Sequence, residues 1–253
     1  MFFDLKGKKV LVTGGSRGIG RAIAVRLAEA GADVAINYLR KVSSAEKTAD
    51  LIRATGREAM IIKANVANEQ HLQSMFDQIE SQFGNLDILI SNAASGVLKP
   101  VLELSLHHWH WTMDINAGTL IPMSQHFRRV LPQGTTGNII AVSSLGAIRA
   151  IPNYTAVGAS KAALESVVRH LAAELAGENI HVNAVSAGLV ETDALRHFPN
   201  RDELIKRSLE KTPAGRLTTP EDVADAVLFL CSPLADMIHG QTIIVDGGYS
   251  ILG

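Results

Sequence analysis

The sequence has a single cysteine and almost no net charge, and these two shortages exclude several classes of protein. Cys231 has no second thiol among the 253 residues, so no intrachain disulfide can form. The 24 lysines and arginines are balanced by 25 aspartates and glutamates, which leaves a formal net charge of −1. This balance gives no general attraction to phosphate backbones or anionic lipid, so we expect no nucleic-acid partner.

Long apolar runs and the features of a secretory leader are also missing. The chain reaches charged residues at Asp4 and Lys6, before any apolar stretch of the length found in signal peptides. No apolar run approaches the length that crosses a bilayer. We therefore expect a cytoplasmic protein that does not insert into a membrane.

What the sequence does contain is an alternation of short β-branched runs with longer segments of helical period. Strands are expected near residues 9–13, 33–38, 58–63, 87–91, 138–142, 180–185 and 242–245. Helices are expected near residues 18–30, 43–55, 68–83, 104–131, 154–177 and 220–231. This alternation predicts a single α/β domain over residues 1–253, a doubly wound parallel sheet of the Rossmann type with about seven strands and helices on both faces. The irregular region within about 189–215 is interpreted as a substrate lid.

A glycine-rich segment follows the first expected strand and leads directly into a helical pattern. Residues 13–20 read Thr-Gly-Gly-Ser-Arg-Gly-Ile-Gly. Glycines at this place let the backbone turn sharply and approach a pyrophosphate, whose charge is met by the free N–H groups at the start of the helix. A purely structural tight turn would also need glycines, but the order of strand, glycine loop and helix favours dinucleotide binding.

The spacing of Gly14, Gly18 and Gly20, Gly-x-x-x-Gly-x-Gly, resembles that of the short-chain dehydrogenase/reductase family. The resemblance covers essentially the whole chain, because further family motifs occur in order: Ser91-Asn92-Ala93-Ala94, Asn116, Ser143-Ser144, Lys161, Gly188, Thr192 and Asp246-Gly247-Gly248. It implies an oxidoreductase with a nicotinamide cofactor, assembled as a homotetramer or dimer through two long helices. It also implies cofactor contacts at Gly14, Ser16, Arg17, Gly18, Ile19, Gly20, Tyr38, Arg40, Asn65, Val66, Asn92, Ala93, Lys161, Gly188 and Thr192.

The residues at the end of the second expected strand bear on the choice between NAD and NADP. An acidic side chain there would receive the ribose hydroxyls of NAD, whereas a basic one would bind the 2′-phosphate of NADP. Residues 37–41 read Asn-Tyr-Leu-Arg-Lys, and Arg17 lies in the glycine loop. A guanidinium binds phosphate through two hydrogen bonds, and a carboxylate would repel it. We therefore expect NADPH, the alternative being that Arg40 and Lys41 only solvate a helix start.

The tyrosine that would accompany Lys161 is displaced. Members of the family usually carry tyrosine four residues before this lysine, but that position is Val157. Tyr154 stands seven residues before Lys161, which still returns to nearly the same helix face because an α-helix has about 3.6 residues per turn. The shift moves the phenol by about 4.5 Å along the axis if the helix begins near Asn153, a good N-cap residue.

The displacement indicates a reaction on an α,β-unsaturated thioester. In ketone reduction the hydride goes to the carbon that bears the oxygen, whereas in enoyl reduction it goes to the β-carbon and charge develops on a more distant carbonyl oxygen. A donor placed farther off suits the second case. The spacing of seven resembles the enoyl-acyl-carrier-protein reductases, and residues 92–100, 109–113, 143–149 and 193–201 resemble their NADPH-dependent bacterial form, enoyl reductase III. This resemblance implies fatty acid biosynthesis with an acyl carrier protein or coenzyme A thioester as substrate.

Each expected catalytic group has a separate task under this interpretation. Tyr154 would hydrogen-bond the thioester oxygen as the enolate forms. Lys161 would hold the nicotinamide ribose hydroxyls, and its positive charge would lower the pKa of the tyrosine. Ser144 and Asn116 match family positions that support the pair.

Two other functions stay open. A reductase of 3-oxoacyl thioesters or other carbonyls would need Tyr154 to reach the site by a local bend, and Val157 at the usual position argues against it. A non-catalytic NADPH-binding module is expected to show damage to the Tyr/Lys pair, and both residues are present.

Two clusters of side chains, one of histidines and one of basic residues, suggest a metal site and a docking surface, but each also has a simpler structural interpretation. Residues 107–111 read His-His-Trp-His-Trp, but adjacent histidines on a helix point in different directions and no cysteine or carboxylate framework accompanies them. We therefore expect no metal site. Arg196, Arg201, Lys206 and Arg207 in the expected lid could either meet an acidic carrier protein or form a solvated face.

Overall fold

The protein is built on one seven-stranded parallel sheet of the Rossmann type. The computed structural model describes residues 3–192, 195 and 201–252. The strands are β1 (Lys9–Val12), β2 (Asp33–Tyr38), β3 (Ala59–Lys63), β4 (Ile88–Ser91), β5 (Gly137–Ser144), β6 (Ile180–Ala187) and β7 (Thr242–Val245). They lie in the order β3-β2-β1-β4-β5-β6-β7, and each neighbouring pair is parallel. The expected fold class is confirmed.

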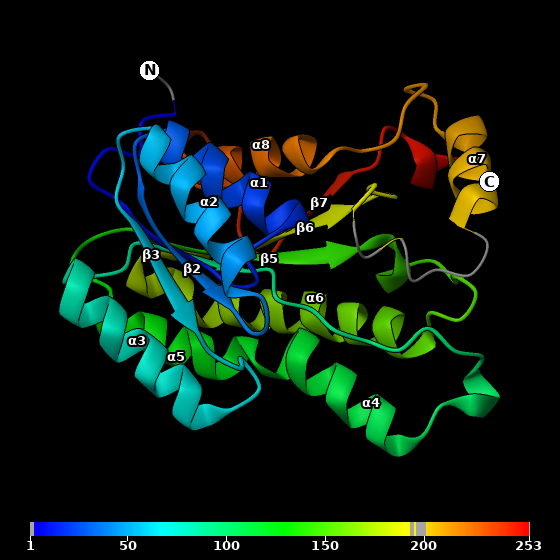
Figure 1. Ribbon diagram of the computed structural model, residues 1–253, viewed down its shortest axis with the longest axis horizontal. Coiled ribbons are helices and arrows are strands. Elements are labelled where there is room, and N and C mark those ends of the chain that lie inside the picture. Colours follow the sequence, from blue (N-terminus) through cyan, green and yellow to red (C-terminus); the bar gives the residue numbers. More distant parts are fainter. Residues whose placement is uncertain (1–2, 193–194, 196–200, 253) are drawn as a thin grey trace.

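Helices cover both faces of the sheet (Figure 1). One face carries α1 (Gly18–Glu29), α2 (Val42–Ala54) and α8 (Pro220–Leu230). The opposite side carries α3 (Glu69–Phe83), α4 (Leu106–Met113), α5 (Leu120–Val130) and α6 (Thr155–Leu175). A further helix, α7 (Arg201–Lys211), stands beyond the carboxyl ends of the strands, near the C-terminal residues.

The interior consists of two apolar layers, one on each side of the sheet. Leu11 belongs to the layer shared with α3, α5 and α6, whereas Val10 and Val12 belong to the layer shared with α1, α2 and α8. Successive side chains of a strand point to opposite faces, so one short strand contributes to both layers. No helix among the described residues is long and apolar enough to cross a membrane.

The segment expected as one helix over 104–131 is interrupted, so this expectation is wrong. α4 ends at Met113, a π-helical stretch follows over Asp114–Gly118, and α5 begins at Leu120. The wider turn carries the buried side chain of Asn116, whose hydrogen bonds reach outside the helix. Single-turn π segments occur inside α-helices and frequently mark functional sites, and hydrogen bonds that are remote in sequence set their position here.

The region interpreted as an irregular lid within about 189–215 contains a helix, α7, at Arg201–Lys211. Residues 193–194 and 196–200 lie outside the described residues. The polar composition of α7 conceals its apolar stripe from a search for helical period. The role of the segment as a lid stays a prediction.

At the amino end of the sheet, Asp33 collects three hydrogen bonds on a buried carboxylate. The carboxylate accepts from Lys9 Nζ at 2.7 Å, from Arg57 Nε at 3.0 Å and from the Glu58 backbone N–H at 2.9 Å. Burial by itself raises the pKa of Asp33, but these donors outweigh burial and hold the pKa below its ordinary value. The resulting stability is present above the pKa of the unfolded state and is lost as pH falls through the lower folded pKa.

Replacement of this carboxylate tests its contribution to the fold. Asp33→Asn should lower the free energy of unfolding by about 1–3 kcal/mol at pH 7, because two partly buried cations would then face a neutral amide. Asp50→Asn is the matched control, since Asp50 pairs with Arg53 at an exposed position and such pairs contribute about 0–1 kcal/mol. Urea unfolding measures both variants, and equal losses in the two would contradict the assignment.

Candidate active site

The expected site residues gather at the carboxyl ends of the parallel strands (Figure 1). The glycine loop follows β1, and the other expected cofactor contacts follow β2, β3, β4 and β6 or lie on α6. β1 lies between β2 and β4, so the strand order reverses beside the glycine loop. Ligands of open α/β sheets bind at such a reversal, outside the carboxyl ends of the strands.

Thr13 and Asn92 hold the glycine loop in place. The Thr13 hydroxyl donates to the Ile90 carbonyl at 3.1 Å and accepts from the backbone N–H groups of Asn92 and Ala93 at 3.0 and 3.1 Å. The Asn92 side-chain amide donates to the carbonyls of Thr13 and Gly14 at 2.9 and 3.2 Å. Asn92 and Ala93 are expected as cofactor contacts, and the structure shows that they also tie the end of β4 to the loop.

Gly20 and Gly18 are glycine for different reasons. A Cβ atom on Gly20 would lie 2.4 Å from Nδ2 of Asn92. Gly18 adopts φ +55°, a left-handed conformation that glycine favours. The atoms nearest to its missing Cβ belong to Thr192, 3.5 Å away. The structure thus brings Thr192, from the loop after β6, beside the glycine loop.

The start of α1 suits the pyrophosphate of a dinucleotide. α1 begins at Gly18, its N-cap residue Arg17 supplies no side-chain hydrogen bond to the first turn, and the first turn has no acidic residue. N–H groups in the first turn of a helix lack intrahelical acceptors, and the helix dipole favours an anion there. Gly18, Ile19 and Gly20 form the first turn, Ser16 and Arg17 precede it, and together they would hold the phosphates.

Asn37, which the sequence does not single out as a site residue, links β2 to the glycine loop. Its buried side chain accepts from the Gly14 N–H at 3.3 Å and donates to the Ala64 carbonyl at 3.0 Å. An amide can make both bonds, because it carries a donor and an acceptor. Its place at the end of a buried strand, where an apolar residue is ordinary, is the signal that could have identified it.

The residues after β2 offer positive charge and no acid. Tyr38 ends β2 half-buried, Arg40 is exposed, and Lys41 is the N-cap residue of α2. The first turn of α2 has no acidic residue. A cation at a helix N-terminus is unfavourable beside the positive end of the dipole, so this end of α2 suits an added anion such as a phosphate.

Asn65 and Val66 follow β3 and face different surroundings. Asn65 is half-buried, and its side-chain oxygen accepts from the Ala67 N–H at 3.1 Å. Val66 is buried in the core layer, and its carbonyl accepts from the Thr119 hydroxyl at 2.7 Å. Of the two expected adenine-side contacts, Asn65 presents a polar side chain, and the side chain of Val66 is part of the core.

Gly188 lies where β6 and β7 end together. Its N–H donates to the Val245 carbonyl at 2.9 Å, and a Cβ there would lie 3.0 Å from the Asp246 backbone. A larger residue would fit there only if its neighbours shifted by a few tenths of an ångström. The loop that follows leads to Thr192 and so to the start of α1.

Tyr154 and Ser144 are hydrogen-bonded. The Tyr154 hydroxyl donates to Ser144 Oγ at 3.3 Å. Ser144 ends β5, and Tyr154 is the N-cap residue of α6. Gly146 makes room for the ring, because a Cβ at that residue would lie 2.5 Å from Tyr154 Cε1. The displaced tyrosine therefore still meets the serine that matches the family position.

Two expectations about Tyr154 are wrong. Asn153 does not cap the helix: it adopts φ +61°, and α6 begins at Thr155. Asparagine tolerates this left-handed conformation, and the turn uses it for that property rather than for capping. The pKa of Tyr154 is raised instead of lowered, because burial disfavours the phenolate and outweighs the hydrogen bond to Ser144.

The ammonium group of Lys161 is buried between α6 and β5. Nζ donates to the Val142 carbonyl at 2.8 Å, and the residue is 6% exposed. Burial lowers the pKa of Lys161 to about 8, against the opposing effect of the negative charge of Glu165. The sequence does not single out Glu165, although its spacing of four from Lys161 on a helix is a readable signal.

Asn116 joins the loop after β4 to α6. Its side-chain oxygen accepts from the Ser95 N–H at 2.8 Å, and its amide donates to Ser160 Oγ at 2.9 Å. Ser160 directly precedes Lys161 on α6. The structure thus brings Asn116 to the helix turn that carries the lysine, as a supporting position requires.

Val157 lies on α6 between Tyr154 and Lys161 and is packed against the loop after β4. It is buried, and a Cβ on Gly96 would fall 2.3 Å from its Cγ2 atom. The close approach of Val157 thus leaves no room for a side chain at position 96.

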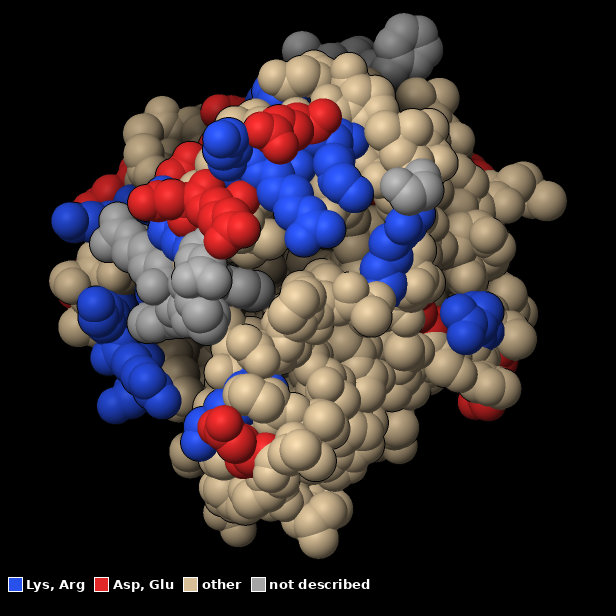
Figure 2. Space-filling view, turned by 90° about the vertical axis from the view of Figure 1, so that its right-hand side faces the viewer, with Lys and Arg blue, Asp and Glu red and all other residues tan. Residues whose placement is uncertain are grey.

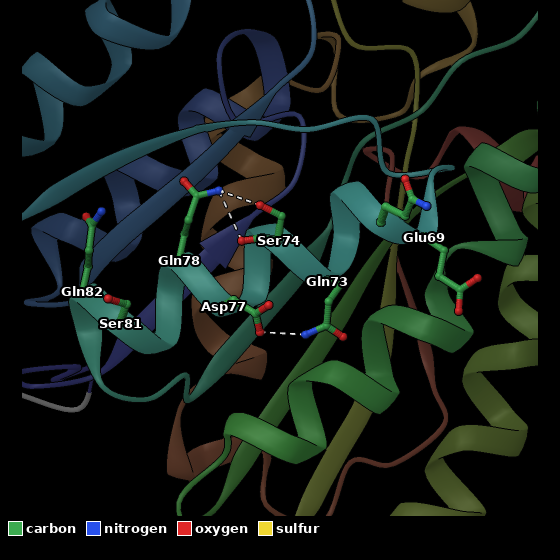
Figure 3. Close-up of a pocket in the computed structure, with 8 residues that line it drawn as sticks. Glu69, Gln73, Ser74, Asp77, Gln78, Ser81 and Gln82 are labelled. Carbon is green, nitrogen blue, oxygen red and sulfur yellow. Dashed lines mark hydrogen bonds between the residues drawn. The ribbon is translucent and has the colours of Figure 1, made fainter.

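A hollow on the outer surface is separate from these residues (Figure 3). It runs along one helix, α3, and is lined by Glu69, Gln70, Gln73, Ser74, Asp77, Gln78, Ser81 and Gln82. Gln78 donates to Ser74, and Gln73 donates to Asp77, so several of these side chains bond to one another. The expected catalytic residues are not among those that line it.

Acidic and basic side chains are interleaved on the face that carries α7 and the C-terminal residues (Figure 2). Arg201 pairs with Glu191, and the first turn of α7 is acidic. Lys206 and Arg207 are exposed, and Arg196 lies outside the described residues. The described part of the expected lid thus mixes both charges.

One histidine of residues 107–110, His108, caps the helix that carries it. His108 and Ser105 form a capping box at the start of α4, in which each side chain accepts from the backbone N–H of the other. Within residues 3–192, 195 and 201–252, no three His, Cys, Asp or Glu side chains are grouped so that they could hold a metal ion.

Comparison with known proteins identifies the family. A family model described as Enoyl-(Acyl carrier protein) reductase matches residues 14–250. The 1-cyclohexenylcarbonyl-CoA reductase of Streptomyces collinus is 37% identical over 96% of this chain and 86% of its own length. The structure of a 7α-hydroxysteroid dehydrogenase complexed with NADH and 7-oxo glycochenodeoxycholic acid has a TM-score of 0.93 at 33% identity, over 98% of this chain and 96% of that chain.

A structure with the other nicotinamide cofactor is also similar. A short-chain dehydrogenase from Burkholderia cenocepacia J2315 in complex with NADP has a TM-score of 0.88 at 35% identity, over 97% of this chain and 99% of that chain. These similarities extend over nearly the whole chain and agree with the order of motifs at the strand ends. The chain belongs to the short-chain dehydrogenase/reductase family of NAD(P)-binding oxidoreductases.

Proposed function

We propose that this protein uses NADPH to reduce the α,β-double bond of trans-2-enoyl thioesters. The observation that carries the proposal is the position of Tyr154 at the start of α6, while Val157 is packed against Gly96. In an enoyl thioester the carbonyl oxygen lies several bonds away from the β-carbon that receives the hydride. A phenol one turn before position 157 suits an oxygen at that distance. The description of the family model and the similarity to 1-cyclohexenylcarbonyl-CoA reductase support the same reaction class.

The side chains of the site have distinct tasks in this reaction. NADPH, when bound, supplies the hydride that adds to the β-carbon. The π electrons of the double bond form a new double bond between the α-carbon and the carbonyl carbon, and the carbonyl π electrons move onto the thioester oxygen. Tyr154 donates a hydrogen bond to the enolate that forms. The raised pKa of Tyr154 keeps the phenol protonated for this task. Ser144 orients the phenol, and a proton taken up from solvent at the α-carbon restores the thioester.

The cofactor would lie across the ends of β1, β2, β4 and β6. The start of α1 would bind the pyrophosphate, Arg40 with Arg17 would bind the 2′-phosphate, and Lys161 would hold the nicotinamide ribose. The absence of an acid in residues 38–41 supports NADPH over NADH. The same proposal includes a coenzyme A or acyl carrier protein thioester as substrate, a cytoplasmic place in fatty acid biosynthesis, and a homotetramer or dimer.

Reduction of 3-oxoacyl thioesters or other carbonyls is the second candidate. The hydrogen bond from Tyr154 to Ser144 favours it, because it shows that the displaced phenol reaches the serine at the end of β5. The similarity to a 7α-hydroxysteroid dehydrogenase also fits carbonyl chemistry. A purely NADPH-binding module is the weaker third candidate, because such a module is expected to lack an intact pair of Tyr154 and Lys161, and the sequence carries both residues.

Loss of the Tyr154 hydroxyl tests the proposed reaction. Tyr154→Phe should lower the turnover number for crotonyl-CoA by about 100-fold or more, because the developing enolate loses its donor. The dissociation constant for NADPH should not change. NADPH oxidation, followed by absorbance with crotonyl-CoA and acetoacetyl-CoA side by side, measures the effect.

Tyr249→Phe is the matched control, because it removes a phenolic hydroxyl from the C-terminal segment, and its turnover should equal that of the wild type. Unchanged turnover in Tyr154→Phe would remove this residue from the reaction. If the wild-type protein reduces acetoacetyl-CoA and does not reduce crotonyl-CoA, the proposed enoyl reduction is wrong and carbonyl reduction, the second candidate, takes its place.

Arg40 tests the choice of cofactor. Arg40→Ala should raise the KM for NADPH about tenfold or more and leave the KM for NADH unchanged, because the side chain would contact only the 2′-phosphate. Arg53→Ala, at the other end of α2, is the control. Equal effects on both cofactors, or no effect on either, would contradict the assignment.

A further inference from the structure

Glu165 is a buried acidic residue that the proposed reaction leaves without a task. It is 8% exposed and follows Lys161 by four residues on α6. Residues four apart on a helix lie on the same face, one turn from each other. The Glu165 Oε1 atom accepts a hydrogen bond from Ser143 Oγ at 2.6 Å.

Neighbouring residues of β5 hold the two charged groups. Lys161 Nζ donates to the Val142 carbonyl, and Ser143, the next residue, donates to the carboxylate of Glu165. The side chain of Val142 belongs to the apolar layer on the far face of the sheet. Because side chains alternate along a strand, the Ser143 hydroxyl faces α6. β5 therefore fixes an ammonium group and a carboxylate that lie one turn apart on the same face of α6.

A counter-charge matters at this depth. A buried ammonium group tends to release its proton, and a carboxylate nearby opposes that release. Burial lowers the pKa of Lys161 to about 8, and Glu165 acts in the opposite direction. The lysine is charged well below that pH and loses its charge as the pH rises through it.

We propose that Glu165 is a positioning residue that keeps Lys161 charged and, through Ser143, fixes the end of β5 that carries Ser144. The inference rests on the proposed role of Lys161 in binding the nicotinamide ribose. In this role Glu165 and Ser143 act through Lys161 and Ser144 and do not themselves contact substrate or cofactor.

The other titratable groups on α6 and on the segments packed against it are exposed, paired or directed elsewhere. Tyr154, the N-cap residue of the same helix, is half-buried and donates to Ser144. On the segments packed against α6, His110 and Asp114 are exposed, and His181 stands at the far end of β6. The charged groups of α5 are His126, which lies beside Phe76, and Arg128 and Arg129, which pair with Glu178, Asp77 and Glu80.

The test is the pH dependence of NADPH binding in the full-length protein, measured by nicotinamide fluorescence from pH 7 to 10. Glu165→Gln keeps the size of the side chain and removes its charge. The alkaline midpoint at which NADPH affinity is lost should fall by about one pH unit. Ser143→Ala frees the carboxylate from its anchor and should move the midpoint in the same direction by about half a unit. Glu174→Gln, an exposed position on the same helix, should leave it unchanged.

The outcomes separate this inference from the proposed function, because the measurement needs no substrate. A lower midpoint in Glu165→Gln supports the inference even if the protein reduces neither thioester. A folded Glu165→Gln with the wild-type midpoint, or a wild-type profile that is flat across this range, overturns it. If circular dichroism shows that Glu165→Gln does not fold, Ser143→Ala decides: a lowered midpoint supports the inference, and an unchanged midpoint overturns it.

Discussion

The burial of one positive charge, the ammonium group of Lys161, is the constraint on which the candidate site depends. A lysine at this depth needs an acceptor and a nearby negative charge, and β5 contributes to both through the Val142 carbonyl and the hydroxyl that holds Glu165. The same strand ends in Ser144, which binds Tyr154. A parallel strand covered on both faces thus fixes the lysine, the serine and the phenol relative to one another.

The fold and the dinucleotide half of the site are readable from the sequence because local signals and tertiary structure agree there. The strand, the glycine loop and the start of α1 follow one another without interruption, so the place of Gly14, Gly18 and Gly20 can be predicted from order alone. β2 and β7 have the predicted bounds, since a short β-branched run between polar residues has few alternatives.

The parts that the sequence does not reveal depend on contacts between distant segments. The π turn carries Asn116, whose amide group bonds to Ser95 and Ser160, residues that no local pattern connects. Asn153 looks like a helix cap, but the chain uses its tolerance of a left-handed backbone. The direction of the Tyr154 pKa shift follows from burial, a property of the folded molecule as a whole.

The central claim is that the hydride adds to the β-carbon of an enoyl thioester while the phenol of Tyr154 donates a hydrogen bond to the thioester oxygen. The most direct measurement uses NADPH that carries deuterium at the transferred position, with crotonyl-CoA and acetoacetyl-CoA as substrates, and locates the deuterium in the products by NMR and mass spectrometry. The account predicts butyryl-CoA with one deuterium on the β-carbon. A hydroxyacyl product with deuterium on the carbinol carbon, and no labelled butyryl-CoA, would contradict it.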